Sequence, residues 1–167
     1  MKILDCTLRD GGYYTNWDFD DKLVNDYLEL VKFLPIDIVE VGYRGHKNKN
    51  SYLGEFYYLT KNNLKNIKSK IGKNKKLSIM IDTKDWSNPK ELKDNLKDCK
   101  KIVDIIRFAV NPKKINNLEK FLNETKKMGF NIAVNLMYSH LLLKNDLLIK
   151  KILKLSKKYD LKVSELS

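Results

Sequence analysis

The feature that most limits how this chain can fold is a regular alternation between short apolar runs and longer amphipathic segments. Each short run has the length and character of a buried strand, whereas each longer segment repeats apolar residues at helical spacing. The strand–helix unit recurs at intervals of roughly 30 residues. The predicted strands are 3–9, 36–42, 77–82, 102–110, 131–137 and 161–167, and the predicted helices are 20–34, 53–71, 89–100, 114–128 and 144–159. The start of the second predicted helix, 56–59, also suits an irregular turn.

Strands that alternate with helices predict a parallel sheet covered by helices, and therefore an α/β protein. Two architectures fit the order: an open doubly wound sheet, or a partial TIM (β/α)8 barrel of about five β-α units plus a sixth strand. No glycine-rich phosphate-binding motif follows a predicted strand, which disfavours the nucleotide-binding form of the open sheet. The length of 167 residues suits one domain, so we expect residues 1–167 to form a single domain.

The most chemically distinctive stretch is 4–12, Leu-Asp-Cys-Thr-Leu-Arg-Asp-Gly-Gly. We expect Arg9 and Asp10 to lie at the C-terminal end of the first strand, followed by a sharp turn at Gly11 and Gly12. A carboxylate is a hard ligand for a divalent cation, and a guanidinium stabilises negative charge. The pair therefore predicts a site for a metal ion and an anionic oxygen, although a surface ion pair before a turn would use the same residues.

A second acidic residue lies inside a predicted strand. Glu40 alternates with Ile36 and Ile38, so its carboxylate shares a face with apolar side chains. A charge in that position is costly unless it is paired, and Arg9 at the end of the neighbouring strand is the expected partner. The pair is either a structural salt bridge or the support of a catalytic arginine, and both readings place it in the interior of the fold.

Polar residues recur at or near the C-terminal ends of the predicted strands, where both architectures carry their chemistry. Only three of the 33 basic residues are arginine, and all three lie in or beside predicted strands. Arginine offers a rigid fork of donors that suits carboxylate, phosphate or enolate oxygens. The polar residues at strand ends are Arg9, Asp10, Glu40, Arg44, Asp82, Arg107, Asn111, Asn135, Ser139, His140 and Glu165.

The chain carries a net charge of +12, with lysines spread along its whole length rather than gathered in one block. Binding to a polyanion therefore stays an alternative, but no nucleic-acid recognition motif is present, so we do not expect nucleic acid as a partner. No apolar run is long enough to cross a membrane, and none at the N-terminus resembles a signal peptide. Two cysteines without CxxC spacing favour a reducing, cytoplasmic setting.

Residues 5–12, together with Val-Glu-Val-Gly at 39–42, resemble the DRE-TIM metallolyase family. That family includes hydroxymethylglutaryl-CoA lyase and 4-hydroxy-2-oxovalerate aldolase, and residues 135–140 are similar to the fifth strand and following loop of the aldolase branch. The resemblance implies a TIM barrel with a divalent metal at its mouth. It also implies that a carbon–carbon bond next to a carbonyl is made or broken through an enolate, on a 2-oxo acid or acyl substrate.

The resemblance assigns roles to individual residues. Asp10 would bind Mg²⁺ or Mn²⁺, Arg9 would stabilise the enolate oxygen, and Glu40 would hold Arg9. Tyr13 stands where the aldolase branch has an acid/base histidine, and a phenol is a poor base near neutral pH. His46 or His140 could replace that histidine. The candidates for substrate binding are Arg44, Asp82, Arg107, Asn135 and His140.

Two departures from the family pattern matter. A complete barrel of this kind needs eight strands and about 250 residues, and the family's His-x-His metal pair is absent. Residues 1–167 are therefore expected to be the front two-thirds of an aldolase-type barrel. Either the sequence is truncated, or a partner chain or a second copy completes the barrel, or the chain is an open sheet that has lost the chemistry. The alternatives to a lyase are a non-catalytic binding or interaction protein and a basic polyanion-binding module.

Overall fold

The computed structural model describes residues 2–46, 51–143 and 145–163. The chain forms two compact units. The first runs to Met80 and also includes Asp98–Asp104, and the second comprises Ile81–Lys97 together with the chain from Ile105 onward. Each unit is built from parallel strands and covering helices, as the alternating sequence pattern predicts.

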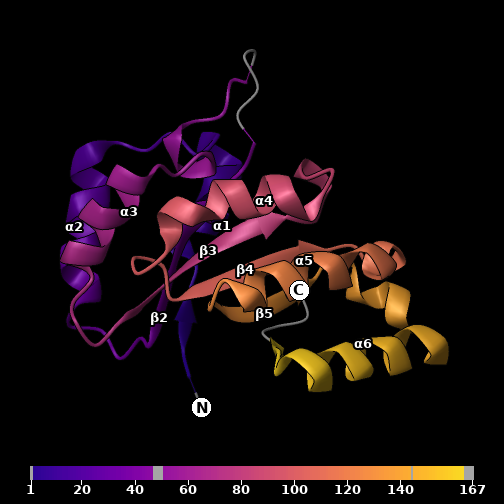
Figure 1. Ribbon diagram of the computed structural model, residues 1–167. Coiled ribbons are helices and arrows are strands. Elements are labelled where there is room, and N and C mark those ends of the chain that lie inside the picture. Colours follow the sequence, from indigo (N-terminus) through magenta and orange to yellow (C-terminus); the bar gives the residue numbers. More distant parts are fainter. Residues whose placement is uncertain (1, 47–50, 144, 164–167) are drawn as a thin grey trace. The chain divides into compact units, whose positions relative to one another are not determined.

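The first unit contains three parallel strands with β2 in the middle. Several apolar residues of β2 and β3 are fully buried, among them Val39, Val41, Leu77 and Ile79. Helices α2 and α3 lie side by side in this unit (Figure 1). Its elements are β1 (Leu4–Asp5), α1 (Thr7–Thr15), α2 (Asp21–Val31), β2 (Ile38–Tyr43), the 3-10 turn η1 (Glu55–Tyr57), α3 (Lys61–Lys70) and β3 (Lys76–Asp82), whose last two residues belong to the second unit.

The prediction of a first strand that continues to Arg9 is wrong. Strand β1 ends at Asp5, and helix α1 begins at Thr7. The Asp5 carboxylate accepts hydrogen bonds from the backbone N–H of Thr7 at 3.0 Å and from its hydroxyl at 3.2 Å, which satisfies a free donor at the start of the helix. Arg9, Asp10 and Tyr13 consequently lie on one helix at spacings of three and four residues, where side chains share a face.

The two glycines of the motif lie within α1 and do not form the turn that the sequence predicts. The helix ends at Thr15 and is capped by Asn16, which adopts the left-handed conformation; Trp17 after it also has a positive φ. Trp17 then folds back over the helix, and its ring occupies the space where a side chain on Gly12 would lie. Gly12 is therefore needed for a close approach of an indole ring, and not of a ligand.

The second unit contains three parallel strands with β5 in the middle. Helix α5 packs along β4 and β5 in Figure 1. Val134 and Leu136 of β5 line an apolar space together with Leu118 of α5 and Leu155 of α6, so this face of the strands is the one that the helices cover. The elements are η2 (Thr83–Asp85), α4 (Pro89–Leu96), β4 (Ile105–Val110), η4 (Pro112–Lys114), α5 (Ile115–Lys127), β5 (Asn131–Leu136), η5 (Ser139–Leu142), α6 (Asp146–Tyr159) and β6 (Lys162–Val163), and the turn η3 (Lys97–Cys99) spans the boundary between the units.

Most predicted elements are confirmed within a few residues of their expected ends. The segment 53–71 divides into η1 and α3, and β4 begins at Ile105 because 100–104 forms a turn in which Lys101 has a positive φ. The last predicted strand, 161–167, is confirmed only for β6, since 164–167 lie outside the described residues. None of the helices in the described segments combines the length and apolar character of a membrane-spanning segment.

Candidate functional site

The centre of the candidate site is the pair formed by Arg9 of α1 and Glu40 of β2. Arg9 Nε donates to Glu40 Oε1 at 3.0 Å, and Glu40 is fully buried. The second carboxylate oxygen of Glu40 accepts from the hydroxyl of Ser78 on β3 at 3.2 Å. The expected pairing of Arg9 with Glu40 is confirmed, although the arginine reaches it from a helix. Because both oxygens of the buried carboxylate are engaged, Arg9 is held in one position.

Asp10 lies beside Arg9 and completes a small charged group. One of its oxygens pairs with Arg9 Nη1, and the other accepts from the Cys6 thiol at 3.1 Å. The Asp10 side chain is 54% exposed, whereas that of Arg9 is 10% exposed. The charged group therefore presents one carboxylate to solvent on top of a buried arginine–glutamate pair.

The charged neighbours also fix the protonation of this group. Burial disfavours the charged form of Arg9, but the carboxylates of Glu40 and Asp10 outweigh it, so the pKa of Arg9 lies above its ordinary value. Burial, followed by the hydrogen bond to Asp10, raises the pKa of the Cys6 thiol to about 12. The site thus holds a permanent cation next to a protonated thiol.

Aromatic side chains surround the same end of α1. The hydroxyls of Tyr13 and Tyr43 lie 3.0 Å apart, and the Trp17 ring makes edge contacts with both tyrosines. Tyr57 stacks on Tyr43 with ring centres 4.9 Å apart. The indole N–H of Trp17 donates to the backbone carbonyl of Arg9 at 3.2 Å, which ties the aromatic cluster to the charged group.

The remaining predicted residues of the first unit, Arg44 and His46, follow β2. Arg44 follows β2 as expected, but its Nη1 donates to the carbonyl oxygen of Leu59 and so braces the chain segment after η1. His46 is exposed.

Three predicted residues of the second unit have local structural contacts. Asp82 accepts from the backbone N–H of Lys84 at 3.0 Å and pairs with its ammonium at 2.9 Å, so it caps the turn η2. His140 is exposed within η5 and makes an edge contact with Tyr138. Asn111 accepts from the backbone N–H of Lys113 and caps η4.

Arg107 and Asn135 form a second polar group, on the face of β4 and β5 that α5 and α6 do not cover. Residue pairing joins Arg107 with Ala133 and Ala109 with Asn135, so Arg107 and Asn135 share that face in diagonal positions. Each is 2% exposed. Within the described residues, Asn135 Oδ1 has no hydrogen-bond partner, while its amide nitrogen lies 3.4 Å from Met137 Sδ. Glu165 lies outside the described residues, as does the side chain of Ser139.

Whether this site could bind a divalent metal depends on which side chains are available as ligands. Among the described residues, no group of three or more histidine, cysteine, aspartate or glutamate side chains lies together in a way that could hold a metal ion. Asp10 offers one hard carboxylate with a half-exposed side chain. It would fit as a single protein ligand of such a cation, with water or substrate oxygens needed as the further ligands.

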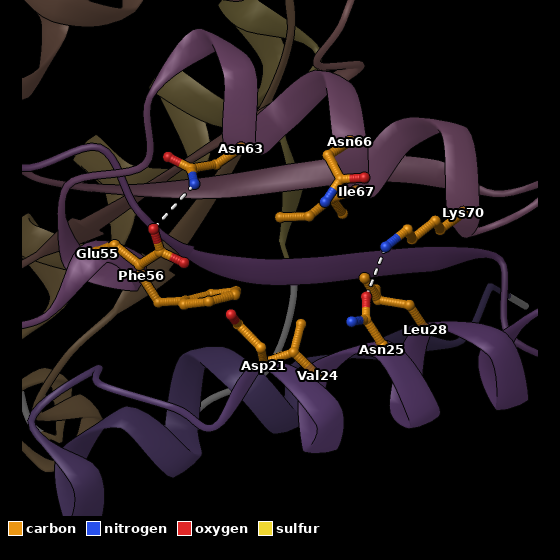
Figure 2. A pocket seen from close by; sticks show the side chains of 10 residues that line it. All are labelled: Asp21, Val24, Asn25, Leu28, Glu55, Phe56, Asn63, Asn66, Ile67 and Lys70. Atoms are coloured by element: carbon orange, nitrogen blue, oxygen red, sulfur yellow. Dashed lines mark hydrogen bonds between the residues drawn. The ribbon is translucent and has the colours of Figure 1, made fainter.

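A separate groove lies between α2, η1 and α3 and has a volume of about 180 Å³. Val24, Leu28, Phe56 and Ile67 contribute apolar side chains to its lining, and Figure 2 shows the hydrogen bonds Asn63–Glu55 and Lys70–Asn25 at its two ends. The groove contains none of the charged residues around Arg9. The residues that line it are Asp21, Val24, Asn25, Leu28, Glu55, Phe56, Asn63, Asn66, Ile67 and Lys70.

Sequence reasoning missed Cys6, Trp17, Tyr43 and Ser78 as neighbours of the charged group. Ser78 carried a usable signal, because it is a small polar residue in an apolar strand and its pairing partner on β2 is Glu40. The position of Tyr43 depends on an irregularity in β2 that residue alternation cannot reveal.

Comparison with known proteins supports the fold. The structure is similar to the N-terminal domain of a "putative aldolase" from Bacteroides vulgatus, with a TM-score of 0.79 and 34% identity. That alignment covers 98% of this chain but 62% of the other, so the chain spans less than two thirds of its relative. A phospho-2-dehydro-3-deoxyheptonate aldolase from Thermotoga maritima aligns over 97% of this chain and 40% of its own length, with a TM-score of 0.56 and 11% identity, which shows the fold alone.

No protein-family model matches the chain, and neither does any curated protein. The fold class is therefore established by structure: an α/β chain with the architecture of part of an aldolase-like TIM barrel. The finer DRE-TIM resemblance rests on residues 5–12 and 39–42.

Proposed function

We propose that this chain is part of a DRE-TIM-type lyase or aldolase that cleaves or forms a carbon–carbon bond next to a carbonyl, through an enolate. The observation that carries the proposal is the buried Arg9–Glu40 pair, which holds a permanently charged guanidinium beside the half-exposed Asp10. A buried pair of this kind is costly to assemble and is a weak source of stability. A role of Arg9 in stabilising a negatively charged intermediate would explain why the chain contains this pair.

In this mechanism Arg9 offsets the charge that develops on the enolate oxygen as the carbon–carbon bond breaks. Glu40 and Ser78 fix the guanidinium in advance, so little reorganisation is needed when the charge appears. The bonding electron pair moves into the enolate. The other fragment leaves as CO₂, or as a carbonyl compound whose hydroxyl proton passes to water. The carbon that carried the bond then takes up a proton.

The proton source we propose is Tyr13, four residues after Arg9 on α1. Its side chain is 56% exposed, so the phenol can exchange its proton with water. A phenol gives up a proton to a strongly basic enolate carbon readily, whereas it accepts one poorly near neutral pH. Tyr13 therefore suits the protonation step of a cleavage reaction.

A divalent cation, Mg²⁺ or Mn²⁺, is the proposed cofactor, with Asp10 as its ligand in this chain. When bound, such an ion would polarise the carbonyl and carboxylate oxygens of a 2-oxo acid or a related acyl substrate. Arg107 and Asn135 are proposed to contact the substrate, because both are buried polar groups on the strand face that α5 and α6 do not cover. Arg44, Asp82 and His140 remain weaker candidates, since each already has the local contact described above.

A second copy of the chain or a partner chain is proposed to complete the barrel. The exposed apolar residues at the C-terminal side of the second unit support this, because Leu143, Leu147 and Leu153 are 75%, 82% and 55% exposed. Apolar residues gathered on one segment in this way mark an interaction surface.

The function is tested with oxaloacetate, a 2-oxo acid whose C3–C4 bond breaks to release CO₂ and the enolate of pyruvate. Because the chain forms only part of a barrel, we expect weak decarboxylation that still exceeds the rate of Mg²⁺ alone. Arg9→Met should lower it at least about 100-fold, because one donor to a developing oxyanion is worth that much. Lys22→Met, which removes an exposed positive charge on α2, is the matched control and is expected to retain the wild-type rate. Equal rates in Arg9→Met and the wild type would contradict the proposal.

A further inference from the structure

The end of β2 contains a β-bulge that changes which way its last side chain points. Glu40 pairs with Ser78 on β3 and Tyr43 pairs with Met80, so three residue steps on β2 match two on β3. Residues paired across neighbouring strands share a face, and Ser78 and Met80 share a face by alternation. Glu40 and Tyr43 therefore point to the same side, although simple alternation would place them on opposite sides.

The bulge depends on Gly42. Its φ is +157°, and a side chain at this position would collide with the backbone carbonyl oxygen of Phe56, which passes close to the strand. The segment after Phe56 is fastened to the end of β2, because the backbone N–H of Leu59 donates to the carbonyl oxygen of Tyr43 at 3.2 Å. Bulges that re-aim a side chain are frequent next to active sites.

Two polar bridges now join α1 to the same face of β2. Arg9 reaches Glu40 at 3.0 Å, and the hydroxyl of Tyr13 reaches that of Tyr43, also at 3.0 Å. In each bridge the residue on the helix is the more exposed one and the residue on the strand is buried. Tyr13 is 56% exposed and Tyr43 is 3% exposed.

We propose that Tyr43 is a positioning residue for Tyr13, holding its phenol in place as Glu40 holds Arg9. This inference rests on the proposed function, in which Tyr13 gives its proton to the enolate carbon. As that proton leaves Tyr13 Oη, the hydroxyl of Tyr43 donates a hydrogen bond to the developing phenolate and keeps its own proton. Water then returns a proton to Tyr13 through its exposed side.

The surroundings of Tyr43 suit such a role. Its ring is fixed by stacking on Tyr57 and by an edge contact with Trp17, so its hydroxyl cannot swing away. The positive charge of Arg9 lies close enough to interact with the Tyr43 oxygen. A fixed, buried donor next to a cation is the arrangement that stabilises a transient negative charge.

The test follows exchange of the pyruvate methyl protons with D₂O by NMR, in the presence of Mg²⁺. The exchange is run at about pH 9, because a phenol accepts a proton only in its ionised form. In this reaction the C3–H bond breaks, its proton passes to the Tyr13 phenolate, and a deuteron from solvent returns by the same route. We expect Tyr13→Phe to lower kcat about 100-fold and Tyr43→Phe to lower it about tenfold, with KM for pyruvate changed less than about twofold. The double variant is expected to match Tyr13→Phe, because the two hydroxyls act as a unit.

Tyr58→Phe is the matched control, since it also removes a phenol hydroxyl from the aromatic cluster, but one whose partner is Ser51. It is expected to retain wild-type kcat. A second readout does not depend on catalytic activity. The unfolding equilibrium constants of the wild type, the two single variants and the double variant measure the coupling between Tyr13 and Tyr43. We expect a coupling of about twofold to tenfold, the value of one hydrogen bond.

The inference is overturned if Tyr43→Phe keeps the wild-type kcat, if its loss multiplies with that of Tyr13→Phe, or if the unfolding constants show no coupling. A wild-type protein that decarboxylates oxaloacetate but shows these results would leave the proposed function intact and remove Tyr43 from it. A wild-type protein inactive in both reactions would overturn the proposed function and the inference together.

Discussion

The neighbouring glycines of α1 should respond in opposite ways to the same substitution. A Cβ on Gly12 would lie well under 3.0 Å from three atoms of the Trp17 ring, so the ring or the helix must move. A Cβ on Gly11 would meet the Phe19 ring at 3.6 Å, which is an ordinary contact. Both glycines have helical backbone within α1, so any difference between Gly11→Ala and Gly12→Ala comes from packing.

The magnitude follows from how firmly Trp17 is held. Its ring is 6% exposed, contacts three tyrosines and donates a hydrogen bond to the carbonyl of Arg9. Overpacking at such a site costs about 1–3 kcal/mol. Gly11→Ala should instead stabilise the protein by roughly 0.5–1 kcal/mol, because alanine loses less backbone entropy in a helix. Because both variants gain this backbone entropy, they should differ by the packing cost alone, about 1–3 kcal/mol.

Urea unfolding followed by circular dichroism measures both free energies of unfolding under the same conditions. We expect the midpoint of Gly12→Ala to fall below that of the wild type and the midpoint of Gly11→Ala to rise above it, with unchanged slopes. Equal midpoints for the two variants would show that Trp17 does not pack on α1 in the way described here.

Three further predictions concern the charged group. Glu40→Ala should lower the free energy of unfolding by about 3 kcal/mol because it leaves a buried charge on Arg9, whereas Asp10→Ala should cost under about 1 kcal/mol in the same denaturation assay. Iodoacetamide should alkylate Cys6 at pH 8 at least about 100-fold more slowly than a free thiol, since its pKa is raised to about 12 and the thiolate is the nucleophile. The rate should rise about tenfold per pH unit and increase in Asp10→Asn, and a rate that levels off near pH 9 would contradict this. Mn²⁺ binding followed by EPR should be weak in the wild type and lost in Asp10→Asn, and unchanged binding would remove Asp10 as a ligand.

The order of elements could be predicted because it depends on local chemistry. Asp20 caps α2, Thr60 and Asn63 form a capping box for α3, and Asn88 caps α4 just before Pro89. These signals lie within a few residues of the ends that they define. The same reasoning failed at 3–9, because a seven-residue alternation of polar and apolar residues does not distinguish a strand from the start of a helix.

The Arg9–Glu40 pair was predictable for a different reason. A carboxylate inside a strand needs a cation within reach, and Arg9 follows the neighbouring strand directly in the chain. The argument holds whether the arginine lies on a strand or a helix, so the pair is confirmed even though its secondary structure was predicted wrongly. The roles of the two residues in catalysis stay predictions.

Tyr43 could not be found from the sequence. Counting from Glu40, alternation places Tyr43 on the opposite face, and only the bulge at Gly42 returns it to the same side. That bulge depends on the approach of Phe56, which is distant in the sequence and belongs to a segment of irregular structure. Contacts of this kind are properties of the folded chain and leave no periodic signal.

The claim at the centre of this account is that Arg9, fixed by Glu40, binds the negative charge of an enolate. Oxalate is a planar dianion that resembles the enolate of pyruvate, so its binding can be measured by calorimetry without any turnover. In the presence of Mg²⁺, we expect wild-type protein to bind oxalate and Arg9→Met to bind it at least about tenfold more weakly, with Lys22→Met unchanged. Equal affinity of the wild type and Arg9→Met for oxalate would contradict the account.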